Sequence, residues 1–234
     1  MVARRILFIR LFCFGNVVGY QQNEAKAGYK MVTPSFDSIG EATYNIQDLS
    51  VEGAEDMAAT IQTMNSAGGW TAMYYWYNEY TEGGVTYPAG WFDALGVTEA
   101  DINLKPGEAV FYYAGTDTTV QSAGEVATEV SLTANNGYTM VGNGTPVSIN
   151  VSDISLSGAS VADMAVTLQT MNAAGQWTAM YYWYNEFTEG GVTYPAGWFD
   201  ALGVNEADVT LAPGESVFLY APIDGVVVDI PSAL

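Results

Sequence analysis

The stretch WTAMYYWYNE, at residues 70–79, recurs without change at residues 177–186. It lies inside a longer repeat in which residues 64–114 align with residues 171–221 at an offset of 107. In this alignment 42 of the 51 positions are identical. Agreement over that length shows that the sequence contains an internal duplication, so we expect one fold to be built twice.

The duplicated region extends upstream of its strongest match. GYKMV at residues 28–32 corresponds to GYTMV at residues 137–141. We therefore expect two tandem β repeat units, at residues 15–121 and 122–234. A separate N-terminal apolar segment, residues 1–14, precedes them.

Each unit has the pattern of short strands separated by turns. In residues 70–77 large side chains occupy both alternating sets, so we expect both faces of the sheet at this strand to be covered or engaged in a contact. Gly83-Gly84 predicts a tight turn, and Pro106-Gly107 fits a type II turn, in which Pro sets φ and Gly accepts a positive φ. The pattern predicts an all-β protein of two tandem β-sandwich or jelly-roll-like domains.

We expect each unit to open with a β-hairpin. In the first unit residues 17–22 turn through residues 26–28 into residues 29–32. The second unit has the same arrangement around residues 135–137, where Asn-Gly is a strong turn signal because both residues tolerate positive φ. Residues 53–60 predict one short helical turn.

The composition is acidic and aromatic. The chain has 26 acidic residues, a formal net charge of −20, 16 Tyr, nine Phe and six Trp. Its six basic residues all precede residue 106, and they are Arg4, Arg5, Arg10, Lys26, Lys30 and Lys105. Nucleic acids and anionic membranes are bound through clustered Lys and Arg, so we expect neither partner. We interpret the charge as favouring solubility in a salty or extracellular medium.

Most familiar catalytic and metal sites need residues that the chain lacks. It has no histidine and a single cysteine, Cys13. Histidine-containing zinc sites, Ser-His-Asp triads and Cys-His pairs are therefore excluded, as is a disulfide within the chain. The carboxylates show neither a calcium-loop spacing nor a pattern typical of a catalytic pair. We expect no enzymatic activity, no cofactor and no metal.

Several motifs carry a resemblance to a group of bacterial proteins. They are NVVGY at residues 16–20, AGYKMV at 27–32, AATIQTMN at 58–65, WF and DALG at 91–96, and LKPGEAVFYYA at 104–114. In these motifs the chain resembles uncharacterised secreted β-rich repeat proteins, which carry NVVGY-like sequence after a signal peptide and close each unit with a PG turn and an aromatic strand. The resemblance covers most of both units and implies export and a β fold, with no activity.

The N-terminal segment MVARRILFIRLFCF has a basic start and an apolar run, as signal peptides do, but Arg10 interrupts the run. The run is too short to span a bilayer. If this segment is retained, we expect an assembly strand that seeks a sheet edge on a neighbouring molecule, formed by Ile6, Leu7, Phe8, Ile9, Leu11, Phe12 and Phe14. A second apolar strip lies at residues 226–230.

Aromatic residues are the candidates for contact with a glycan or partner. Exposed Trp and Tyr rings stack on sugar faces, and two equivalent sites on one chain gain avidity on a polymer. The candidates are Trp76, Tyr77, Tyr87 and Trp91 in the first unit and Trp183, Tyr184, Tyr194 and Trp198 in the second. The alternative is that these rings fill the cores of the two sandwiches or the joint between them.

The sequence favours a structural role. We expect an extracellular or cell-surface, non-enzymatic protein that assembles with itself into a filament or surface layer by exchange of a terminal strand. The alternative is a bivalent carbohydrate-binding protein that uses exposed Trp and Tyr. Because subunits of charge −20 repel one another, we expect salt to strengthen assembly.

Overall fold

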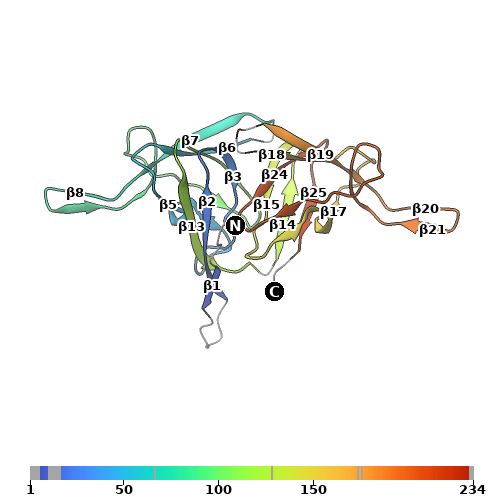
Figure 1. Cartoon of the computed structure of the whole chain (residues 1–234), viewed down its shortest axis with the longest axis horizontal. Helices are drawn as coiled ribbons and strands as arrows, with labels where there is room; N and C mark the ends of the chain where they lie inside the picture. The colour runs from blue at the N-terminus through green and yellow to red at the C-terminus, as the bar shows by residue number, and fades with distance from the viewer. Residues whose placement is uncertain are drawn as a thin grey trace.

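The computed structural model describes residues 6–9, 17–65, 67–127, 129–172, 174 and 176–231. In this part of the chain the fold is all-β, with antiparallel sheets and two short 3-10 helices, η1 (Ile46–Asp48) and η2 (Val151–Asp153). The molecule is elongated, with the strands up to β13 on one side of its middle and the strands from β14 onward on the other (Figure 1). We call the described residues up to 125 the N-terminal half and those from 126 to 231 the C-terminal half.

The N-terminal half contains two main sheets. The β2 sheet has the order β1 (Ile6–Ile9), β2 (Val18–Ala25), β13 (Thr118–Glu125), β5 (Ser50–Glu52). The β3 sheet has the order β10 (Gly90–Phe92), β7 (Trp70–Tyr77), β6 (Ala59–Met64), β12 (Val110–Ala114), β3 (Gly28–Val32). Two small sheets join β4 (Tyr44–Asn45) to β11 (Asn103–Leu104) and β8 (Tyr80–Glu82) to β9 (Val85–Tyr87).

The C-terminal half has a matching set. The β14 sheet has the order β14 (Val130–Ala134), β25 (Val226–Ile230), β17 (Ser155–Gly158). The β15 sheet has the order β15 (Gly137–Gly142), β24 (Ser216–Ala221), β18 (Thr167–Met171), β19 (Trp177–Tyr184), β22 (Gly197–Phe199). The small sheets join β16 (Ile149–Asn150) to β23 (Thr210–Leu211) and β20 (Phe187–Glu189) to β21 (Val192–Tyr194).

Each half buries its own hydrophobic core, to which both of its main sheets contribute, as in a β-sandwich. In β12 burial alternates with the strand period, since Val110 and Tyr112 point into the core while Phe111 and Tyr113 do not. The large buried residues of the N-terminal core include Tyr44, Ile46, Leu49, Ile61, Trp76, Trp91, Val110 and Tyr112. Those of the C-terminal core include Ile154, Leu168, Trp183, Trp198, Val217 and Leu219.

The predicted opening hairpins are wrong. β2 pairs with β1 and β13, whereas β3 pairs with β12 in the other sheet, so the turn before Gly28 carries the chain across the sandwich. β14 and β15 are separated in the same way. The predicted helical turn is also displaced: residues 53–58 form bends and turns, and the 3-10 helix η1 lies earlier in the chain.

The terminal strips pair within their own chain. β1 is antiparallel to β2, and β25 lies between β14 and β17, so both edges of β25 are occupied. The C-terminal strip is therefore not available for strand exchange. Of the predicted N-terminal assembly strand, Leu11, Phe12 and Phe14 lie outside the described residues.

The two halves are joined by a symmetric contact. Val32 of β3 forms a bridge with Glu215, and the corresponding Val141 of β15 forms one with Glu108. A third hydrophobic cluster fills the joint, with Met31, Ala109, Met140 and Phe218 buried and with Met64, Phe111 and Met171 packed against them. The halves therefore share an interface of methionine and phenylalanine, built from corresponding positions of the repeat.

Both Pro-Gly turns are used in this joint. Gly107 and Gly214 have φ of 85° and 80°, as the type II prediction requires. The carbonyl oxygen of Pro213 accepts hydrogen bonds from Gln21 Nε2 at 2.8 Å and Asn23 Nδ2 at 3.2 Å in the other half. A Cβ on Gly107 would lie 2.9 Å from Cγ1 of Val130, so this turn also packs against the opposite half.

Asp37 provides a test of electrostatics in the N-terminal half. Burial, and next the charge of Glu125, raise the pKa of Asp37, and its Oδ1 is buried without a hydrogen-bond partner. A raised pKa means that the folded state holds the proton more tightly than the unfolded state, so the carboxyl group stabilises the fold at low pH. That stability is lost as the pH rises through the raised pKa.

We therefore expect Asp37→Asn to raise the free energy of unfolding at pH 7 by about 0.5 kcal/mol, a value that allows for solvent screening. Urea denaturation of the native protein and the variant, at pH 7 and at pH 3, measures the difference in the free energy of unfolding. The gain should vanish at pH 3, where the native Asp37 is itself protonated. A gain that is the same at both pH values would contradict the electrostatic explanation.

Candidate functional site

The tryptophans predicted to contact a ligand are core residues. Trp91 and Trp198 are fully buried. Trp76 is 4% exposed and packs edge-on against Trp91, and Trp183 is 6% exposed and packs in the same way against Trp198. The prediction that these four rings line a carbohydrate site is therefore wrong, because they are packed in the two cores instead of presenting their faces to solvent.

The four predicted tyrosines lie nearer the surface. Tyr87 and Tyr194 are exposed on the hairpins formed by β8–β9 and β20–β21. Tyr77 and Tyr184 are partly buried, and the ring of Tyr77 packs edge-on against Phe92 with centroids 5.8 Å apart. The structure therefore does not bring the four predicted residues of either unit together into one exposed site.

Two other tryptophans face outward because of a β-bulge. Gln62 pairs with Met73 and Met64 pairs with Trp70, so β7 has one more residue than β6 between these two pairs. The extra residue reverses the alternation and places Trp70 on the outer face of the β3 sheet with Met73. There Trp70 is 46% exposed, and its ring lies 4.8 Å from that of Phe111.

β19 repeats this arrangement. Trp177 is 51% exposed, and its ring lies 4.9 Å from that of Phe218. Sequence reasoning chose Trp76 and Trp183 and missed Trp70 and Trp177, because strict alternation places all four on one face and does not show which pair is exposed. The bulge that separates them has no signal in the local sequence.

Two hairpins project from the ends of the molecule. Arm 1, formed by β8 and β9, and arm 2, formed by β20 and β21, extend in opposite directions along the longest axis (Figure 1). Each arm is a two-stranded sheet that pairs with no other strand of the described chain, and all its strand residues are exposed. Each arm therefore presents two free strand edges.

The arms have nearly the same sequence and the same face. Gly83 and Gly84 both have positive φ, which confirms the predicted tight turn of arm 1. Tyr80 and Tyr87 lie opposite each other with stacked rings 4.7 Å apart, and Val85 shares their face. In arm 2 the corresponding stacked pair is Phe187 and Tyr194, and the corresponding valine is Val192.

The base of each arm is fixed by hydrogen bonds. Asn78 Nδ2 donates to the carbonyl oxygen of Ala54 at 3.0 Å and to Asp56 Oδ1 at 2.9 Å. Asn78 Oδ1 accepts a hydrogen bond from the indole of the buried Trp76. Asn185 makes the corresponding bonds in the other half. The arms are therefore anchored to the cores and are not simply loose loops.

A third exposed apolar feature is the loop that follows β10. Asp93 Oδ1 accepts hydrogen bonds from the backbone N–H groups of Leu95 and Val97, both at 3.1 Å. The bond from Val97, and next a bond from the Thr98 side chain, lower the pKa of Asp93. This loop leaves Leu95 82% exposed. The loop after β22 has the same geometry around Asp200.

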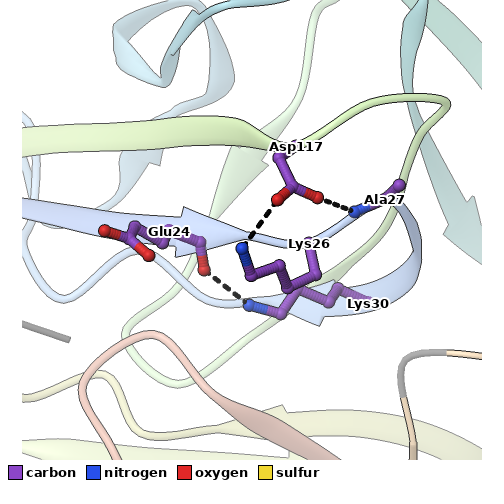
Figure 2. A network of polar contacts seen from close by, with 5 residues as sticks. All are labelled: Glu24, Lys26, Ala27, Lys30 and Asp117. Carbon is purple, nitrogen blue, oxygen red and sulfur yellow. Dashed lines mark hydrogen bonds and ion pairs between the residues drawn. The ribbon is translucent and has the colours of Figure 1, made fainter. Parts of the chain in front are cut away.

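Two lysines lie in a groove between the halves. The groove has a volume of about 380 Å³ and is lined by residues of β2, β3 and the turn at Pro213. Lys26 Nζ lies 2.6 Å from Asp117 Oδ2, and Lys30 Nζ donates a hydrogen bond to the carbonyl oxygen of Glu24. Figure 2 shows how these side chains lie. The hydrogen bond to Asp117 raises the pKa of Lys26. Acidic side chains also line this groove, so it does not present a uniformly positive surface.

Comparison with known proteins gives no match to a family model, to a curated protein or to a solved structure. The surfaces are therefore interpreted from their own geometry. In the described part of the chain, no three His, Cys, Asp or Glu side chains are grouped so as to hold a metal ion. Nor does any helix there have the length and hydrophobicity to cross a membrane.

Proposed function

We propose that this protein is an extracellular, non-enzymatic structural protein that assembles end to end through its two arms. It consists of two tandem β-sandwich domains that arose by duplication, each carrying one arm. The observation that carries the proposal is the pair of nearly identical, free-edged hairpins at opposite ends of one molecule (Figure 1).

The physical reason lies in the edges of the arms. A two-stranded hairpin alone is marginally stable in water, and its unpaired N–H and C=O groups favour the addition of further strands. Pairing of an arm with an arm of the next molecule forms a larger sheet and covers the exposed rings and Val85. Because each chain has an arm at each end, the contact repeats without closing and produces a filament.

Charge opposes this contact at low ionic strength. Each arm carries a glutamate, Glu82 or Glu189, and another glutamate lies just before each arm, at Glu79 or Glu186. The described arms contain no basic residue. We therefore expect polymer to form more readily in 0.5 M NaCl than in 10 mM NaCl, because salt screens the repulsion.

Substitution of the arm valines tests the proposal. Val85→Asp and Val192→Asp place a second carboxylate directly opposite Glu82 and Glu189, and together they are expected to leave the protein monomeric at every salt concentration. Val85→Asp alone leaves one intact arm, so dimers are expected and longer polymers are not. Analytical ultracentrifugation distinguishes monomer, dimer and polymer.

The matched control is Ile39→Asp, which adds the same charge at a hydrophobic residue that is 71% exposed and lies outside the arms. This variant should assemble as the native protein does. Polymer that survives in the double arm variant, or that is lost equally in the Ile39 variant, would refute assembly through the arms.

A further inference from the structure

The outer face of each large sheet carries a row of aromatic rings that crosses all five strands. In the β3 sheet, the residues directly opposite one another on successive strands are Tyr29, Tyr113, Thr60, Tyr75 and Phe92. In the β15 sheet the corresponding residues are Tyr138, Tyr220, Thr167, Tyr182 and Phe199. Each row thus has four rings with a threonine on the central strand.

These rows lie on the solvent side of the sheets. Trp76 and Trp91 pair across β7 and β10 and point into the core, so their neighbours Tyr75 and Phe92 point outward. None of the eight rings is buried, and Tyr29 and Tyr138 are each more than two fifths exposed. Since adjacent strands are about 4.8 Å apart, four steps make each row about 19 Å long.

The rows carry no charge, in a protein whose formal net charge is −20. The next row of the β3 sheet is also uncharged and consists of Met31, Phe111, Gln62 and Met73. In this row Met31 is buried in the joint between the halves and Phe111 packs against that cluster, so Gln62 and Met73 extend the exposed surface. The corresponding row of the β15 sheet is Met140, Phe218, Gln169 and Met180, of which Met140 and Phe218 are buried in the joint. Hydroxyl and amide groups from Tyr, Thr and Gln are the polar groups of this surface.

We propose that the two aromatic rows bind a neutral polysaccharide chain. Tyrosine rings present an apolar face to a sugar ring and a hydroxyl group to its substituents. A row of rings about 19 Å long fits an extended polymer better than a small molecule. The absence of charge in the rows favours a neutral glycan, and the acidic remainder of the molecule repels an acidic one.

The rows begin where the two halves meet. Tyr29 and Met171 line the same pocket of about 250 Å³, and a Cβ on Gly68 would lie 3.1 Å from the ring of Tyr138. One chain therefore holds both rows on a single scaffold, so a polymer that engages both rows gains avidity. This proposal concerns a different surface from the arms and does not depend on self-assembly.

Affinity electrophoresis tests the proposal on the full chain. The protein is run in native gels that contain soluble xylan, mixed-linkage β-glucan or galactomannan, with alginate as the acidic polymer. We expect at least one neutral polysaccharide to retard the native protein and alginate not to retard it. The row variant carries the substitutions Tyr29→Ala, Tyr113→Ala, Tyr138→Ala and Tyr220→Ala, and it should bind at least tenfold more weakly.

The arm variant Tyr80→Ala, Tyr87→Ala, Tyr194→Ala is the control, because it also removes exposed tyrosines but leaves both rows intact. It should bind the polysaccharide as the native protein does, even when it no longer assembles. Far-ultraviolet circular dichroism and thermal unfolding establish that both variants are folded. A variant in which only the row of one half is substituted should still bind the polysaccharide, but more weakly than the native protein.

Three results would overturn the proposal. The first is that none of the three neutral polymers retards the native protein. The second is equal retardation of the native protein and the folded row variant. The third is that the row substitutions change the oligomeric state without any polysaccharide binding, which would make this face a contact between copies of the chain.

Discussion

Replacing Trp91 with alanine is expected to lower the free energy of unfolding by about 3–5 kcal/mol. Trp91 is fully buried, and its ring packs against those of Trp76 and Tyr112. Its indole N–H donates to the carbonyl oxygen of Leu49 at 2.7 Å, so the substitution also leaves this buried acceptor without that partner. Both the cavity left by the missing indole ring and the lost hydrogen bond destabilise the fold.

Trp70→Ala is the matched control, because it removes the same side chain from the outer face of the same sheet. Nearly half of Trp70 is exposed, so we expect a loss below about 1.5 kcal/mol. Urea denaturation followed by far-ultraviolet circular dichroism measures both. Similar losses for the two variants would show that the outward position of Trp70 is wrong.

Replacing Gly142 with alanine is expected to lower the free energy of unfolding by about 3 kcal/mol, at the upper end of the range for an overpacked core. A Cβ at this position would lie only 1.7 Å from Oγ1 of Thr33 in the other half. Thr33 Oγ1 also shares a hydrogen bond of 2.7 Å with Ser216 Oγ. The added methyl group therefore forces the two halves apart at their joint.

The control for backbone flexibility is Gly115→Ala, because a Cβ on Gly115 would have no neighbour within 4 Å. This substitution should change the free energy of unfolding by no more than about 0.5 kcal/mol. Adding Thr33→Gly to the Gly142→Ala variant removes the clashing side chain and should restore part of the stability, with a coupling energy of at least about 1 kcal/mol in a double-mutant cycle. Additive effects would show that the two residues do not meet.

The sequence predicts features that are set by local chemistry. The long aromatic strand β7, the tight turn at Gly83-Gly84 and the positive φ of Gly107 depend on residues close together in the chain, and all three predictions are confirmed. The all-β class follows for the same reason, because many short segments with high β propensity lie between turn residues.

Features set by distant contacts could not be predicted in this way. The turn before Gly28 has the chemistry of a hairpin turn, but β13, about ninety residues later, pairs with β2 and leaves β3 to the other sheet. The same limitation applies to the candidate site. Whether Trp70 or Trp76 faces solvent depends on the bulge between the pairs Gln62–Met73 and Met64–Trp70, which only the pairing of β6 with β7 creates.

The aromatic rows have the same origin. Tyr29, Tyr75 and Tyr113 are far apart in the sequence, and only the order of strands in the β3 sheet aligns them. The arms, in contrast, are local hairpins whose sequence occurs twice in the chain with a single difference, Tyr80 in place of Phe187. The exposure of the arms could not be predicted, because nothing in the repeated sequence shows that these hairpins extend away from the sandwich.

The most direct measurement of arm-to-arm assembly is cysteine cross-linking in solution. The substitution Cys13→Ser removes the native cysteine, and Val85→Cys with Val192→Cys then places one cysteine on each arm. Under mild oxidation in 0.5 M NaCl, we predict a ladder of multimers on a non-reducing gel, whereas the chain with Val85→Cys alone should stop at the dimer. A doubly substituted chain that remains monomeric on that gel, while the native protein forms polymer in the same buffer, would contradict assembly through the arms.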